Sequence, residues 1–173
     1  MKYRNLLIIL LIWIIGFLVY NIFLKNALTE FNPKLYTSEL NNSEIFLHIF
    51  INNSFVIAIL YFGLLSAGVS VILVNFINSI NIYQMLFSLI NKKLYIITIL
   101  TLPHTILELI AIVIASNIGL NGIWLFKAYL NTNTFEIPKN KVLKNYTLSE
   151  ILILVAAFLE VWSLNYINHN FAS

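Results

Sequence analysis

The sequence predicts an all-α membrane protein: a polytopic bundle of about five transmembrane helices, forming a single integral membrane domain over residues 1–173. Of these residues 60% are hydrophobic and only 10% are charged, against about 25% charged in an ordinary soluble domain. Ten cations and seven anions are too few to cover the surface of a soluble domain this small. Together with the mean hydropathy of +0.88, this excludes a soluble or disordered chain.

The first two spans follow from apolar runs of the required length, which is about 20 residues for a helix that crosses the bilayer. Residues 6–24 are predicted as a retained first span, because this run is too long for a signal peptide and no small-residue cleavage site follows it. After a polar stretch, the next apolar run is too long for one crossing. Residues 45–51 are therefore predicted as an interfacial lead-in and residues 53–74 as the second span.

The third and fourth spans are less regular. Residues 76–90 are predicted as a short third span, the alternative being a segment that dips into the membrane and returns. Residues 94–120 are predicted as the fourth span. Pro103 near its middle predicts a broken or kinked helix, because proline lacks the backbone donor and clashes with the preceding turn.

The last part of the chain is mixed in character. Residues 121–145 are amphipathic at first and loop-like around Pro138. Residues 148–167 are predicted as the fifth span. Its start is assigned to Thr147-x-x-Glu150, a pattern typical of a capping box.

The cations predict the orientation, because positive charge is enriched in short cytoplasmic loops. Five crossings with the N-terminus in the cytoplasm place six cations inside (Lys2, Arg4, Lys127, Lys139, Lys141, Lys144) and four outside (Lys25, Lys34, Lys92, Lys93). They flank apolar runs and form no dense basic patch, which argues against a nucleic-acid partner. The lipid bilayer is the first partner that the sequence implies.

Three ionisable residues are predicted to lie at membrane depth: His104, Glu108 and Glu160. A charge at the bilayer centre costs about 2.5–3.5 kcal/mol on insertion scales, so these side chains are expected to face the bundle interior. His104 and Glu108 are four residues apart and share one helix face. His104, Glu108 and Glu160 are expected to form a polar cluster with one or both of Asn52 and Asn53.

The cluster has three interpretations. It could hold helices in register through hydrogen bonds. It could bind a divalent metal such as zinc through His104, Glu108 and Glu160. In that case these residues would be metal ligands or the general base of a catalytic site, and a metal-bound water would be the nucleophile. It could carry protons through a transporter. Asparagine side chains are the candidates for orienting a substrate, and these are Asn52, Asn53 and Asn78.

Residues 102–111, Leu-Pro-His-Thr-Ile-Leu-Glu-Leu-Ile-Ala, resemble the Pro-His-Gly-x-x-Glu helix of the stage II sporulation protein M family. Further family features occur in the same order: Asn52-Asn53, Asn78-Ser79 and Ala156-Ala157-Phe158-Leu159-Glu160. The chain departs from the family pattern in having Thr105 and Ser79 at two glycine positions, and in lacking Thr-Pro after Glu160.

The resemblance implies a multi-pass component of the bacterial cell membrane. The family's namesake is similar to a scaffold that holds peptidoglycan-degrading partners during spore engulfment, and other members accompany circular bacteriocin genes. The expected function is therefore a scaffold or accessory in envelope remodelling, or in bacteriocin maturation, secretion or immunity, acting on other membrane proteins or a peptide. An intramembrane metal-dependent peptidase or cyclase and a small proton-coupled transporter subunit are the alternatives. The sequence leaves oligomerisation open.

Overall fold

Every regular element in the described part of the chain is a helix, which confirms the predicted all-α class. The computed structural model describes residues 2–25, 41–91, 95–134 and 136–171. Five of its helices are long and apolar enough to cross a membrane. The elements are α1 (Lys2–Val19), η1 (Tyr20–Leu24, a π-helical turn), α2 (Asn42–Phe62), α3 (Val69–Asn91), α4 (Tyr95–Gly119), α5 (Asn121–Thr132) and α6 (Lys139–Phe171).

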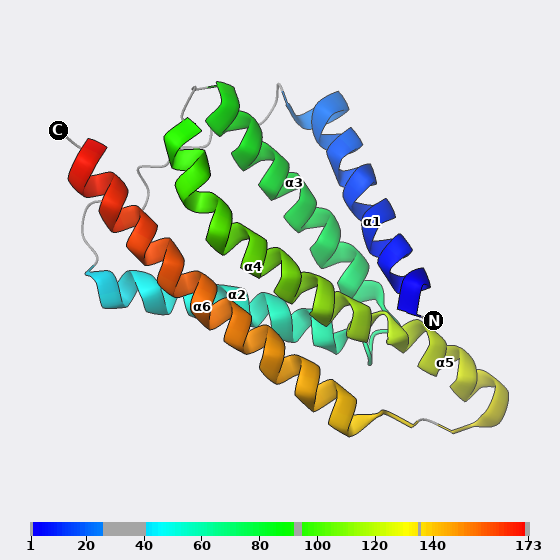
Figure 1. The fold of residues 1–173 in the computed structure, drawn as a ribbon. Coiled ribbons are helices and arrows are strands. Elements are labelled where there is room, and N and C mark those ends of the chain that lie inside the picture. The colour runs from blue at the N-terminus through cyan, green and yellow to red at the C-terminus, as the bar shows by residue number, and fades with distance from the viewer. Residues whose placement is uncertain (1, 26–40, 92–94, 135, 172–173) are drawn as a thin grey trace.

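The long helices alternate in direction, so the two chain ends lie at opposite ends of the bundle (Figure 1). The most extensive helix contact is between α4 and α6. These two helices run antiparallel: Ser163 Oγ donates to the Leu100 carbonyl at 3.0 Å, and Ser149 Oγ donates to the Ala111 carbonyl at 3.5 Å. On the other side of the bundle α1 packs along α3. An odd number of crossings is the arrangement that five spans require.

The boundary between the second and third helices differs from the sequence prediction. The second helix is α2, which begins at Asn42 rather than at residue 53 and includes the expected lead-in. It ends at Phe62, and a turn over residues 63–68 leads into α3. Ala67 (φ 49°) and Gly68 (φ 81°) reverse the chain there. The third span is thus a full 23-residue helix instead of a short one.

The start of α2 is fixed by a capping box that the sequence reading did not assign. The Asn41 side-chain oxygen accepts from the Glu44 backbone N–H at 3.0 Å. In return, the Glu44 carboxylate accepts from the Asn41 backbone N–H at 2.9 Å. Two backbone donors that a helix start leaves free are satisfied in this way.

Helix α4 continues through Pro103, so the fourth span is not broken there. The kink that was the alternative at Pro103 stays a prediction. In lipid, a broken helix would leave more backbone groups without hydrogen bonds than a continuous helix that contains one proline, so the continuous helix is favoured. In the turn after Pro103, Thr105 Oγ1 donates to the Thr101 carbonyl at 2.9 Å.

The predicted capping box at the fifth span is also wrong. Helix α6 begins at Lys139, so Thr147 lies inside it and donates to the Leu143 carbonyl at 3.1 Å. The carboxylate of Glu150 points instead to α2, where it accepts from Ser54. Pro138 immediately before the helix supplies the start, since its carbonyl accepts from the N–H groups of Lys141 and Val142.

Three glycines bring the end of α2 against the junction of α4 and α5. A Cβ atom on Gly119 would overlap the Leu60 carbonyl oxygen, and one on Gly122 would overlap the Gly63 carbonyl oxygen. A Cβ on Gly63 would in turn overlap the Val71 side chain. Only glycine permits backbones to approach this closely.

Replacing Gly119 by Ala is expected to destabilise the protein by about 1–3 kcal/mol, because the added methyl group overpacks a backbone contact. Thermal unfolding in detergent measures the effect. Ala58→Val is the matched control, since Ala58 is exposed on α2, and its effect should stay within about 0.5 kcal/mol. Equal stability of Gly119→Ala and the wild type would contradict this account of the contact.

Candidate functional site

A residue in the middle of α2 forms a hydrogen bond with a carboxylate on α4. Asn53 Nδ2 donates to Glu108 Oε1 at 2.5 Å. Asn53 is half-buried, and it lies near the centre of the 21-residue helix α2. A hydrogen bond from an amide to a carboxylate is stronger than one between neutral groups, and a short distance is typical of it. The pair fixes α2 relative to α4.

The next residue of α2 forms a hydrogen bond with a carboxylate on α6. Ser54 Oγ donates to Glu150 Oε2 at 2.7 Å. Successive residues of a helix point in directions about 100° apart, so neighbours in the sequence can reach two different helices. Asn53 and Ser54 together therefore join α2 to both α4 and α6. Glu150 is a member of this polar layer that the sequence reading missed, because its pattern with Thr147 resembled a helix start.

Of the three predicted site residues, Glu108 and Glu160 are close enough to interact electrostatically. They come from α4 and α6, the two helices in most extensive contact. Like charges repel strongly in a medium of low dielectric constant, so the arrangement favours sharing of a proton or a cation between them. His104 lies one helical turn from Glu108 and is buried, with 6% of its surface exposed. Its Nδ1 atom is buried without a hydrogen-bond partner.

The three predicted asparagines differ in their surroundings. Asn53 bonds to Glu108, whereas Asn52 is exposed on α2. Asn78 is half-buried on α3. The fully buried asparagine of α3 is Asn75, which donates to Ser116 Oγ on α4 at 2.8 Å and accepts from Trp13 Nε1 on α1 at 3.0 Å.

A second asparagine contact joins the start of α1 to the C-terminal end of α4. Asn5 is 1% exposed and donates to the Asn117 carbonyl and to the Asn121 side chain, each at 3.0 Å. Trp124 Nε1 donates to Asn5 Oδ1 at 3.3 Å, and the Arg4 guanidinium lies 3.1 Å from the centre of the Trp124 ring. The sequence signal for this contact was a single polar residue at the start of an apolar run.

The part of the chain that the structure describes contains no preformed set of three metal ligands. Within residues 2–25, 41–91, 95–134 and 136–171, no three His, Cys, Asp or Glu side chains are grouped as a metal ion requires. His104, Glu108 and Glu160 are part of that search. Catalytic zinc sites usually have three protein ligands and a water. The polar layer between α2, α4 and α6 is therefore described best as hydrogen-bonded carboxylates.

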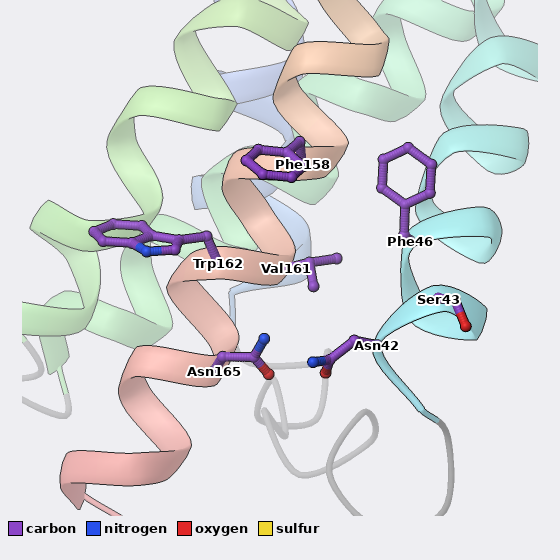
Figure 2. Close-up of a pocket in the computed structure, with 7 residues that line it drawn as sticks. All are labelled: Asn42, Ser43, Phe46, Phe158, Val161, Trp162 and Asn165. Atoms are coloured by element: carbon purple, nitrogen blue, oxygen red, sulfur yellow. The ribbon is translucent and has the colours of Figure 1, made fainter.

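A groove of about 460 Å³ lies between the start of α2 and the end of α6 (Figure 2). Asn42 and Asn165 extend toward each other across it. Its other lining residues are Ser43 and four large apolar side chains, namely Phe46, Phe158, Val161 and Trp162. The groove is thus amphipathic, with amides at one end and apolar walls, and none of the predicted site residues lines it.

Comparison with known proteins gives a match over almost the whole chain. The sequence model of the family described as stage II sporulation protein M matches residues 5–163. An uncharacterized protein of Methanocaldococcus jannaschii is 29% identical over 164 residues, covering 91% of this chain and 92% of that protein. No solved structure matches. The matched range includes every polar residue of the layer between α2, α4 and α6.

Replacing Asn53 by Ala is expected to lower the free energy of unfolding by about 1 kcal/mol, because Glu108 loses its donor at membrane depth. Unfolding with dodecyl sulfate measures the change. Asn52→Ala is the matched control: it removes the same amide from the neighbouring, exposed position. If both variants lose the same stability, the bond to Glu108 does not hold α2 in place.

Proposed function

The chain belongs to the stage II sporulation protein M family, and we propose that it is a membrane scaffold that positions other membrane proteins or a peptide. The observation that carries this proposal is that polar groups of the spans form hydrogen bonds between helices of this chain. The amides and carboxylates between α1, α2, α3, α4 and α6 bond to neighbouring helices of the same chain, as in Asn53–Glu108, Ser54–Glu150 and Asn75–Ser116. These bonds stabilise a defined bundle.

The outward surface supports the same proposal. In each of the five spans at most 28% of the apolar window is buried within the chain. The remaining surface is available to lipid or to other transmembrane helices. Association inside a membrane depends on packing and on interhelical hydrogen bonds, so a rigid helix surface is a suitable contact.

A second surface lies at the end of the bundle, and we call it the α5–α6 arm (residues 121–132 and 139–147). Ile123, Leu125 and Val142 of this arm pack against the bundle core. The 33-residue helix α6 is about 50 Å long, whereas a bilayer core is about 30 Å thick. The arm projects from the end of the bundle near the N-terminus (Figure 1). Its exposed lysines are Lys127, Lys139, Lys141 and Lys144. Exposed apolar side chains lie between them, among them Phe126, Leu130 and Leu143.

We place the arm and the N-terminus on the cytoplasmic side of the bacterial cell membrane. The positive-inside rule favours this orientation, since the end that carries the arm has the larger share of cations. Envelope remodelling and circular-bacteriocin maturation, secretion or immunity are the settings that this scaffold would serve. A cytoplasmic arm with basic and apolar residues suits contact with a partner protein at the membrane surface.

A proton path is the second candidate function, and the placement of Glu108 and Glu160 favours it. Two carboxylates that interact within the membrane can pass a proton between them, and the unpartnered Nδ1 of buried His104 is a further acceptor one turn away. In this version the three side chains carry protons. The peptidase or cyclase alternative uses the same residues with a metal, and no comparable observation favours it.

Site-specific photo-crosslinking in the native host tests the scaffold. A photoreactive amino acid at Leu143 on the α5–α6 arm is expected to give an adduct with one defined protein. The same probe at Phe23, which is exposed in η1 at the opposite end of the first span, is the control and should give a different pattern. Replacing Lys139, Lys141 and Lys144 by Glu should reduce the adduct from Leu143.

Proton flux into liposomes that contain only this protein separates the two functions. A scaffold gives no flux above empty liposomes, and Glu160→Gln leaves its crosslinks intact. Flux that is lost in Glu160→Gln would contradict the scaffold proposal and support the proton path. Absence of any adduct from outward-facing positions would also contradict the scaffold.

A further inference from the structure

The groove between the first turns of α2 and the last turns of α6 is large enough for a hydrocarbon chain and too small for a further helix. Its volume is about 460 Å³. Pockets that bind small ligands have volumes of about 300–1,000 Å³. A helix about 10 Å in diameter fills more than about 100 Å³ per residue, so the groove has room for only about one helical turn.

The polarity of the groove changes along the membrane normal. Asn42 is the first residue of α2, and Asn165 lies two residues before Ile167, where the apolar span of α6 ends. Their amides face each other at this end of the two helices (Figure 2). Phe158 lies nine residues from the end of the span, which is about 14 Å deeper along the helix. Since a bilayer core is about 30 Å thick, the groove runs from a polar mouth at the surface to an aromatic ring near the bilayer centre.

One wall of the groove continues the outward surface of α6. Phe158 and Trp162 line the groove, and they are nevertheless 67% and 56% exposed. Further along the same helix Ile151, Leu154 and Val155 are exposed as well. Exposed apolar side chains of a membrane span are in contact with lipid wherever no other protein covers them. A lipid chain can therefore enter the groove sideways from the bilayer.

The charges near the groove determine which lipids fit it. None of its seven described lining residues is charged. Phosphate groups are usually bound by Arg or Lys, or by the free N–H groups of a helix N-terminus. The N-terminus of α2 is instead capped by Asn41, and its first turn carries the carboxylate of Glu44. An anionic lipid would be repelled by this carboxylate, whereas a lipid without net charge would not.

We propose that the groove binds one membrane glycerolipid without net charge. One acyl chain lies between Phe46 and Val161, and the ester oxygens at its head accept hydrogen bonds from the amides of Asn42 and Asn165. Tryptophan is enriched at the boundary between membrane and water, and Trp162 fits this placement of the lipid head. The site lies at the end of the bundle opposite the α5–α6 arm (Figure 1), and it does not depend on the scaffold proposal.

Photolabelling of the full chain in dodecyl maltoside tests the site. The probe is phosphatidylethanolamine with a diazirine in one acyl chain, and peptide mass spectrometry locates the label. Labelling of residues 158–165 should saturate as the probe concentration rises. Labelling of residues 69–77, whose outward side chains on α3 are apolar, should rise in proportion to it.

Competition between two unlabelled lipids tests the role of charge. Phosphatidylethanolamine has no net charge, whereas phosphatidylglycerol with the same acyl chains is anionic. Both should displace the probe from residues 158–165, and phosphatidylglycerol should need about a fivefold higher concentration because of the repulsion by Glu44.

Two matched pairs of variants separate the groove from the rest of the surface. Asn165→Leu removes one amide and should raise the half-saturating probe concentration about fivefold, as expected for the loss of one hydrogen bond. Asn145→Leu makes the same change at an exposed position of α6 outside the groove and should have no effect. Val161→Phe fills part of the groove and should weaken labelling at least as much. Val69→Phe, at an exposed position of α3, is its control.

Labelling of residues 158–165 that does not saturate overturns the proposal, because lipid then contacts the groove as it contacts any outward surface. Equal competition by the two lipids overturns it as well. A photoreactive amino acid at Val161 that gives a protein adduct in the native host also contradicts it, since a protein segment then fills the groove. Should Asn165→Leu or Val161→Phe fail to fold, saturation and competition in the wild type decide.

Discussion

The bundle depends on one constraint: within the membrane, a polar group without a hydrogen-bond partner is costly. Adjacent residues of α2 meet this constraint for two helices at once. Asn53 binds the carboxylate of Glu108 on α4, and Ser54 binds that of Glu150 on α6. A rotation of α2 by one residue would break both bonds. The dipeptide therefore sets the rotation and the height of α2 against its two neighbours.

Small residues let these helices come close enough for the bonds to form. Ala111 and Ala115 on α4, and Ala156 and Ala157 on α6, are all fully buried. Alanine and glycine bring membrane helices into close contact, and side-chain hydrogen bonds then give that contact specificity. The polar layer and the small residues act together, because hydrogen bonds of 2.5–2.7 Å require helices that are packed this closely.

The features that the sequence predicted are those that depend on composition and run length. Apolar runs identify the spans, and rare charges such as His104 and Glu108 stand out within them. The turn after α2 had no such signal, because Leu64 and Leu65 continue the apolar run and Ala67 is not a typical turn residue. Glu150 was assigned to a helix start for a related reason. A local pattern is visible in the sequence, whereas the partner of Glu150 is 96 residues away.

The three membrane carboxylates consequently differ in surroundings although they share one chemistry. Glu108 faces an amide donor and a second carboxylate, so a charge on it is affected by the state of Glu160. Glu150 interacts with hydroxyl groups, namely those of Ser54, Tyr61 and Tyr146. One peptide unit of α2 separates the donors to Glu108 and Glu150. Because the two donors are adjacent residues of one helix, a movement of α2 that displaces Asn53 from Glu108 also displaces Ser54 from Glu150.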